Sequence, residues 1–236
     1  MATDTSTNVH IIGETVSFGG SDRDVLLLKF DANGRLLWTG EWGGDDGDYG
    51  DGIGIDVEDS LYVTGATDSF GGAERDALLL KYDASGSLLW SGTPDGGGGD
   101  AAVAVTTDSN LGVYVVGATG APSAIDSDSM VLKYGPHGDL VSSRNRVGNA
   151  WEWAITVASE VGRNIYTAGH APSNTGSRYD LTGVALIPDG VAGSPQGTVG
   201  FPEGTESSPE GVVDTGGGER DALLLKNFPS QPVDSH

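Results

Sequence analysis

The chain repeats itself every 52 residues, and this period constrains its fold more than any other feature. Leu26-Leu27-Leu28-Lys29 returns as Leu78-Leu79-Leu80-Lys81, and Leu36-Leu37-Trp38 returns as Leu88-Leu89-Trp90. A third copy keeps the register at Met130-Val131-Leu132-Lys133-Tyr134. A period of about 40–50 residues built from strand-like segments is typical of propeller blades. The sequence therefore predicts an all-β fold, a β-propeller of four-stranded antiparallel blades.

Residues 52–91 illustrate how one copy divides into four strands. Residues 52–57 alternate glycine with larger residues and predict an innermost strand, and residues 61–65 predict a second strand of β-branched and aromatic residues. Residues 76–82 form a continuous apolar run, as expected of a strand that is buried on both faces. Residues 88–91 then follow a tight turn as a short outer strand.

The repeats extend over the whole chain of 236 residues, which predicts a single domain, 1–236. Clear copies extend to about residue 170, residues 171–211 are degenerate, and residues 212–228 form a partial copy. We expect about five blades, of which the last one or two are degenerate. The chain is predicted to open in the second strand of a blade, at residues 8–13, so that ring closure is not obvious from the sequence.

The charge balance is strongly acidic, with 34 Asp and Glu against 12 Lys and Arg and a net charge of −22. Nucleic acids and anionic membranes are excluded as partners, because both need a positive patch, and no apolar run is long enough for membrane insertion. The four lysines, Lys29, Lys81, Lys133 and Lys226, all occupy one repeat position. This composition favours a halophilic, salt-adapted surface over the alternative, an acidic surface that collects Ca²⁺.

Several segments together resemble the SBBP-type β-propeller repeat of bacterial and archaeal proteins. They are Asp76-Ala77-Leu78-Leu79-Leu80-Lys81-Tyr82-Asp83, Gly86-Ser87-Leu88-Leu89-Trp90, Gly47-Asp48-Tyr49-Gly50-Asp51-Gly52-Ile53-Gly54-Ile55-Asp56 and Leu61-Tyr62-Val63-Thr64-Gly65. The resemblance implies a propeller of undefined biochemical role that is often exported or displayed at the cell surface. It brings no catalytic residues with it. The compartment of this chain is otherwise unknown, because the sequence has no cysteine and its first residues form no signal peptide.

An acidic, glycine-rich loop contains the candidate metal ligands Asp45, Asp46, Asp48 and Asp51. Asp46 and Asp48 have the spacing that opens a calcium loop, but Asp51 comes one residue late for the usual third ligand. The alternatives are therefore a Ca²⁺ site and a solvated loop. No other cofactor is predicted, and the histidines form no pair at metal spacing.

The candidate ligand-binding residues are Trp151, Glu152 and Asp100. Trp151 and Glu152 replace Gly99 and Asp100 of the previous copy, and an aromatic side chain in a loop can stack on a carbohydrate or anchor a protein partner. The acids that open the third strand in every copy have a structural role by prediction, because recurrence favours scaffold. They are Asp24, Asp76, Asp128, Asp180 and Asp221.

The sequence identifies no catalytic residue, and it predicts an acidic propeller that acts as a non-catalytic binding or structural module. The alternative is a hydrolase or lyase with its site in the central funnel. The variable loops are expected to meet at one mouth of that funnel, where a ligand would bind. A closed ring predicts a monomer, and an open arc predicts a dimer that covers the exposed blade face.

The net charge gives a first test, in which the melting temperature is measured in increasing KCl. We expect 1–3 M KCl to raise it well beyond the rise of a near-neutral control protein, because the Debye length falls to about 3 Å at 1 M and self-repulsion is screened. Strong stabilisation by millimolar Ca²⁺ together with no response to molar KCl would contradict salt adaptation and favour the calcium alternative.

Overall fold

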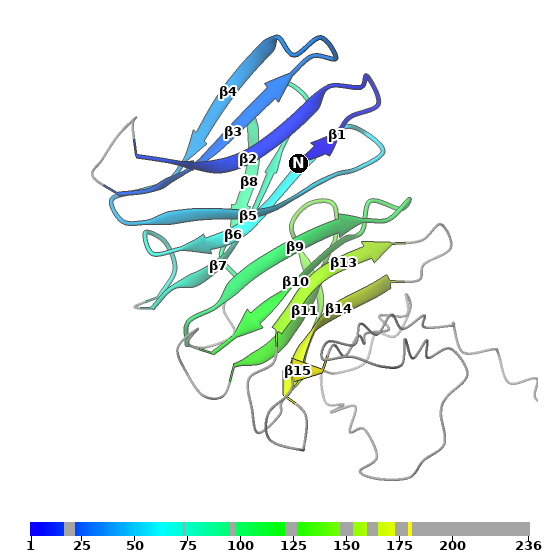
Figure 1. Cartoon of the computed structure of the whole chain (residues 1–236). Coiled ribbons are helices and arrows are strands. Elements are labelled where there is room, and N and C mark those ends of the chain that lie inside the picture. Colours follow the sequence, from blue (N-terminus) through cyan, green and yellow to red (C-terminus); the bar gives the residue numbers. More distant parts are fainter. Residues whose placement is uncertain are drawn as a thin grey trace, which may run out of the picture.

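The computed structural model describes residues 1–16, 22–72, 74–94, 98–120, 127–146, 153–159, 165–172 and 179–180. These residues form four antiparallel sheets that follow one another along the chain (Figure 1). Blade 1 contains β1 (Ala2–Thr3), β2 (Val9–Thr15), β3 (Asp24–Phe30) and β4 (Leu36–Trp42). Blade 2 contains β5 (Asp48–Ile55), β6 (Leu61–Thr67), β7 (Asp76–Tyr82) and β8 (Leu88–Gly92). Blade 3 contains β9 (Ala101–Thr107), β10 (Val113–Thr119), β11 (Asp128–Tyr134) and β12 (Leu140–Arg146). Blade 4 contains β13 (Trp153–Ser159), β14 (Ile165–Pro172) and β15 (Tyr179–Asp180).

The predicted all-β fold of four-stranded propeller blades is confirmed. Each blade is a meander in which neighbouring strands pair antiparallel, and β7 has the predicted bounds. The expectation that the chain opens in a second strand is wrong, because β1 precedes β2 and pairs with it through Ala2 and Thr3. The partial fifth copy at 212–228 lies outside the described residues. The described part of the chain contains no helix that could span a membrane.

The first strand of each blade lies next to the first strand of the following blade. Strands β5, β9 and β13 are neighbours, whereas β4, β8 and β12 form the far edges of their sheets (Figure 1). The Thr107 hydroxyl donates to the Ile55 carbonyl at 3.2 Å, and the Ser159 hydroxyl donates to the Thr107 carbonyl at 2.6 Å. These residues are 52 apart, so the same joint connects blade 2 to blade 3 and blade 3 to blade 4.

A β-bulge interrupts the first strand at the same repeat position in blades 2, 3 and 4. The pairing register shifts across Asp51, Val103 and Ile155, which therefore lack a partner in the ladder. At the bulge, a backbone carbonyl of the first strand lies close to the second strand. A Cβ added at Gly65 would lie 1.8 Å from the carbonyl oxygen of Tyr49. A Cβ added at Gly117 or at Gly169 would lie 1.9 Å from the equivalent carbonyl oxygen of the first strand, so both glycines are under the same constraint. The glycine within the second strand is thus required by the bulge.

The core lies between blades. Val25 and Leu27 of blade 1 pack with Leu78 and Leu80 of blade 2, whereas Leu79 packs toward blade 3. Successive leucines of β7 therefore face different neighbours, which explains its continuous apolar run. Full burial of each leucine contributes about 1.5–3 kcal/mol.

A turn aspartate closes the first hairpin of each of the first three blades. Asp56 accepts hydrogen bonds from the backbone amides of Glu58 and Ser60, both at 2.9 Å, and from the Tyr62 hydroxyl at 3.1 Å. Asp108 accepts the equivalent hydrogen bonds from two backbone amides of its own turn and from the Tyr114 hydroxyl. In blade 1 the tyrosine position is taken by His10, whose Nε2 lies 3.2 Å from the Asp4 carboxylate. His10 is therefore part of the scaffold.

The acid at the start of the third strand gives a test of the scaffold. Asp76 is 3% exposed and accepts a hydrogen bond from the Gly72 amide at 2.5 Å, in a loop where Gly71 has φ +105°. We expect Asp76→Ala to lower the free energy of unfolding by about 1–3 kcal/mol, because the Gly72 amide loses the charged acceptor that holds it in the loop. Glu74→Ala, at an exposed residue of the same loop, is the control in denaturant unfolding. Equal stability of the two variants would refute the structural role of Asp76.

Candidate functional site

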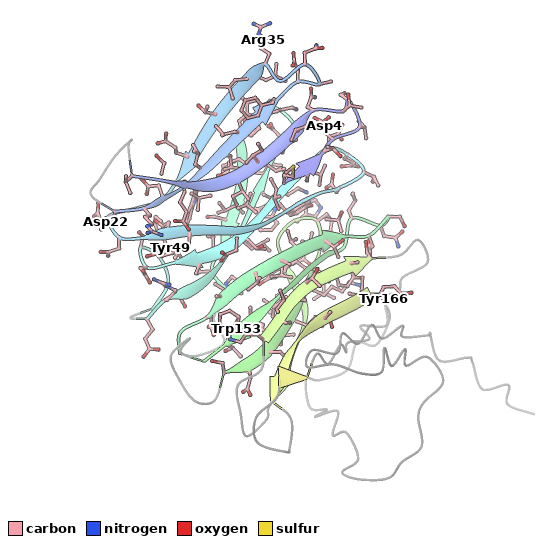
Figure 2. All side chains as sticks on the ribbon, in the orientation of Figure 1. Asp4, Asp22, Arg35, Tyr49, Trp153 and Tyr166 are labelled. Atoms are coloured by element: carbon pink, nitrogen blue, oxygen red, sulfur yellow. The ribbon has the colours of Figure 1, made fainter. Side chains whose placement is uncertain are left out.

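Of the loops that were predicted to converge, those between β4 and β5 and between β6 and β7 lie at one end of the blades, whereas residues 95–97 and 147–152 lie outside the described residues. The connections β2–β3, β4–β5 and β6–β7 leave this end, which we call the loop end, and the tight hairpin turns lie at the other end. Figure 2 shows Asp22, Tyr49 and Trp153 toward the loop end, and Asp4, Arg35 and Tyr166 toward the opposite one. The backbone amide of Asp48 donates to the Arg23 carbonyl at 2.6 Å, and Asp100 donates to Arg75 at 2.7 Å. The loop end is thus joined from blade to blade.

Asp48 and Asp100 hold these loops together. Asp48 is fully buried, and its carboxylate accepts hydrogen bonds from the Thr67 hydroxyl, the Ser69 hydroxyl at 2.8 Å and the Gly44 amide at 2.8 Å. Asp100, at the same repeat position, is equally buried and accepts the Gly120 amide at 3.2 Å. Both carboxylates are therefore occupied by donors of the protein itself.

The remaining predicted residues have different surroundings. Asp45 and Asp46 are exposed, and the Asp46 amide donates to the Ser69 hydroxyl at 3.0 Å. Among the described residues no three acidic or histidine side chains come together as a metal site would require, so the acids from 45 to 51 do not form one cluster there. Trp151 and Glu152 lie outside the described residues.

Asp51 differs from its counterparts in the other blades. It is the bulge residue of β5, and Val103 and Ile155 occupy the same position in β9 and β13. The backbone irregularity is common to the three blades, but the carboxylate occurs only in blade 2. Bulges often lie beside active sites, where they direct a side chain out of the ladder. Asp51 is therefore the strongest candidate for a functional acid at this end.

The surroundings of Asp51 raise its pKa. Burial by the nearby protein is the largest cause, the negative charge of Glu14 adds to it, and the positive charge of Arg75 opposes it. The side chain nevertheless remains exposed to solvent. Glu14 can act on it because β1 pairs with β2 only at Val9 and His10, and β2 also lies beside β5. A solvent-accessible carboxyl group with a raised pKa is suited to proton transfer.

Two arginines, which occupy the same position in their repeats, lie near the carboxylates of Asp51 and Glu14. Arg23 of blade 1 binds Glu14 at 2.8 Å, and Arg75 of blade 2 binds Asp68 through two bonds of 2.9 and 2.7 Å. Their guanidinium carbons lie 5.9 Å and 4.3 Å from the centre of the Tyr49 ring, so both contact one tyrosine. Bidentate pairing and stacking fix the direction of the Arg75 side chain. The site thus combines two carboxylates, two guanidinium groups and a phenol at the junction of blades 1 and 2.

Sequence reasoning missed Glu14, Tyr49, Arg23 and Arg75. One signal in the sequence was available for two of them. Glu14 is replaced by alanine at Ala66 and Ala118, and Tyr49 by Ala101 and Trp153, so both depart from the repeat. The arginine recurs in three copies, as Arg23, Arg75 and Arg220, and the packing of β2 against β5 brings the first two to one ring.

Comparisons with known proteins give a structural likeness but no family. No family model and no curated protein matches the chain, so the resemblance to SBBP-type repeats stays a prediction. A gluconolactonase from Xanthomonas campestris is among the solved structures that match, with a TM-score of 0.40 and 11% sequence identity. The match covers 71% of this chain and 52% of that enzyme, so this chain spans about half the length of the gluconolactonase.

The protein matched is an enzyme, against the expectation of a non-catalytic binding or structural module, and the likeness itself concerns the fold alone. That expectation is withdrawn, and its alternative, a hydrolase or lyase, is retained. The lactonase activity belongs to the Xanthomonas enzyme. For the present chain, function has to be argued from the residues around Asp51.

The raised pKa of Asp51 predicts how a variant responds to pH. In the pH range between the unfolded pKa, about 3.9, and the raised folded pKa, the folded state binds more protons, so stability falls as pH rises. We expect Asp51→Val, which introduces the residue found at Val103, to raise the melting temperature at pH 7 and to give no electrostatic gain below about pH 3.9. Asp45→Val is the exposed control from the adjacent loop. A lower melting temperature for Asp51→Val at pH 7 would show that Asp51 stabilises the fold.

Proposed function

We propose that the protein is a hydrolase or lyase in which Asp51 transfers the proton. The observation that carries this proposal is the position of Asp51, a bulge carboxylate that blade 2 alone places beside Glu14 and Arg75. A residue shared by all copies can be explained by folding. Asp51 cannot be explained in this way, because the same bulge forms with Val103 and Ile155.

The neighbours of Asp51 supply the other parts of an acid–base site. Glu14 keeps the Asp51 proton bound to higher pH, and two carboxyl groups held in different surroundings can act as acid and base. Arg75 is fixed by Asp68 and Tyr49, and it brings a positive charge that can stabilise an oxyanion in the transition state. In hydrolysis, Asp51 accepts a proton from water as the water attacks the substrate, and that proton passes to the leaving group. In elimination, Asp51 accepts the proton from a carbon atom of the substrate and not from water.

The charge of the protein limits the substrate class. A net charge of −22 repels anionic substrates and attracts cations, so a neutral or cationic substrate fits the site better. We also propose a salt-rich setting for this activity, since the acidic residues are distributed over every blade.

The test measures turnover of neutral esters, lactones and glycosides by mass spectrometry, in which hydrolysis adds the mass of water and elimination creates a double bond without adding water. We expect Asp51→Asn and Asp51→Val to lose about 10²–10⁴-fold in kcat, the usual contribution of a positioned acid or base. The control is Asp45→Asn, which removes a carboxylate from the neighbouring loop and should retain activity.

Two outcomes would contradict the proposal. One is a folded Asp51→Asn variant with the turnover of the natural protein. The other is a folded natural protein that turns over none of the three substrate classes between pH 4 and pH 9.

A further inference from the structure

A pair of aromatic rings joins blades 1 and 2 at the loop end. Trp42 closes β4 of blade 1, and Phe70 follows β6 of blade 2. Their ring centres lie 4.9 Å apart and the planes are inclined by 46°. Because the planes diverge, a small group on the open side of the pair can contact both rings. Phe70 is 44% exposed, so part of its ring is accessible to a ligand.

The loop that carries Phe70 is held by several hydrogen bonds. The amides of Ser69 and Phe70 donate to the Thr67 hydroxyl at 3.1 and 3.2 Å. The Ser69 hydroxyl bonds the Asp46 carbonyl at 2.9 Å and the buried Asp48 carboxylate, so the loops of the two blades are tied together. A Cβ at Gly44 would lie 3.1 Å from the Phe70 ring. Phe70 is thus placed in advance, and a ligand need not order it.

Exposed acids belong to the loop that is bonded to the Phe70 loop. Asp45 and Asp46 belong to the loop that Ser69 ties to Phe70, and both are exposed. The nearest described arginine on the Phe70 loop, Arg75, is paired with Asp68. The local charge is therefore negative, in a protein of net charge −22. Aromatic faces attract cations through their quadrupole, and the negative charge of nearby carboxylates adds to this attraction.

The pair is not a requirement of the repeat. At the position of Trp42 the next two copies have Pro94 and Arg146, so the tryptophan is particular to blade 1. The blade scaffold forms without it in blades 2 and 3. Trp42 packs against the core between blades 1 and 2, which explains its own position, whereas the Phe70 ring that it contacts stays partly exposed on a fixed loop and is available to a ligand.

We propose that Trp42 and Phe70, together with Asp45 and Asp46, bind an organic cation of the ammonium class. The rings contact the apolar shell of the cation, and the carboxylates balance its charge. This proposal does not depend on catalysis by Asp51, since it concerns other side chains and binding alone.

The experiment compares choline with 3,3-dimethylbutan-1-ol, its uncharged isostere, by NMR titration of the Trp42 indole and Phe70 amide signals at low salt. We expect choline to bind about tenfold more tightly than the alcohol, in line with the strength of cation–π contacts. Phe70→Leu, which keeps an apolar side chain but loses the ring, should weaken choline about tenfold with little change in the melting temperature.

Two further variants complete the test. Asp45→Asn combined with Asp46→Asn should weaken choline several-fold and flatten its salt dependence. Val57→Ala, at an exposed apolar residue of the opposite end, should leave binding unchanged. Equal affinities for choline and the alcohol, unchanged choline binding by Phe70→Leu, or tighter binding of methyl glucoside than of choline would each overturn the proposal. Loss of turnover in Asp51→Asn with choline binding intact would separate this site from the catalytic one.

Discussion

The fold depends on the fact that a blade cannot cover its own two faces. Each blade is completed by the next, and the contacts that do this recur at the 52-residue spacing. The Lys29 ammonium donates to the Ala84 carbonyl at 3.2 Å, and Lys81 donates to Pro136 at 3.1 Å. The Trp38 ring lies against Gly86, where an added Cβ would come within 3.0 Å of it, and Trp90 lies against Gly138 in the same manner. Stability is therefore nearly a sum of junctions between neighbours.

Because the repeats share one structure, equivalent positions can be compared between copies within the chain. A residue that recurs in each copy, such as the bulge glycine at Gly65, Gly117 and Gly169, is explained by the joint it makes. A residue that departs from the repeat, while the contact between neighbouring blades still forms, has no such explanation. Asp51 belongs to this second kind. Trp42 also departs from the repeat, but it packs against the core at the same junction of blades 1 and 2. Departure from an internal repeat is thus a physical argument for function that needs no relatives.

The sequence predicted the strands well and the site poorly, for identifiable reasons. Strand β7 was predicted with its observed bounds, because an apolar run bounded by Asp76 and a turn is a local signal. The acids from 45 to 51 were grouped as one loop by their closeness in sequence. In the structure Asp48 is buried under Thr67 and Ser69, whereas Asp51 stands in the bulge. The contact of Arg23 and Arg75 with Tyr49 depends on how two blades pack, which periodicity does not specify.

The acidic surface and the candidate site respond differently to salt. Repulsion among exposed carboxylates extends over nanometres and is screened when the Debye length falls to about 3 Å at 1 M. The pKa of Asp51 is raised first by burial and only second by Glu14, and salt does not screen burial. Salt that stabilises the stacked blades would therefore reduce the smaller, charge-based part of the shift and leave the larger part in place. A −22 protein can in this way gain stability from concentrated salt and keep a carboxyl group that holds its proton above the usual pH.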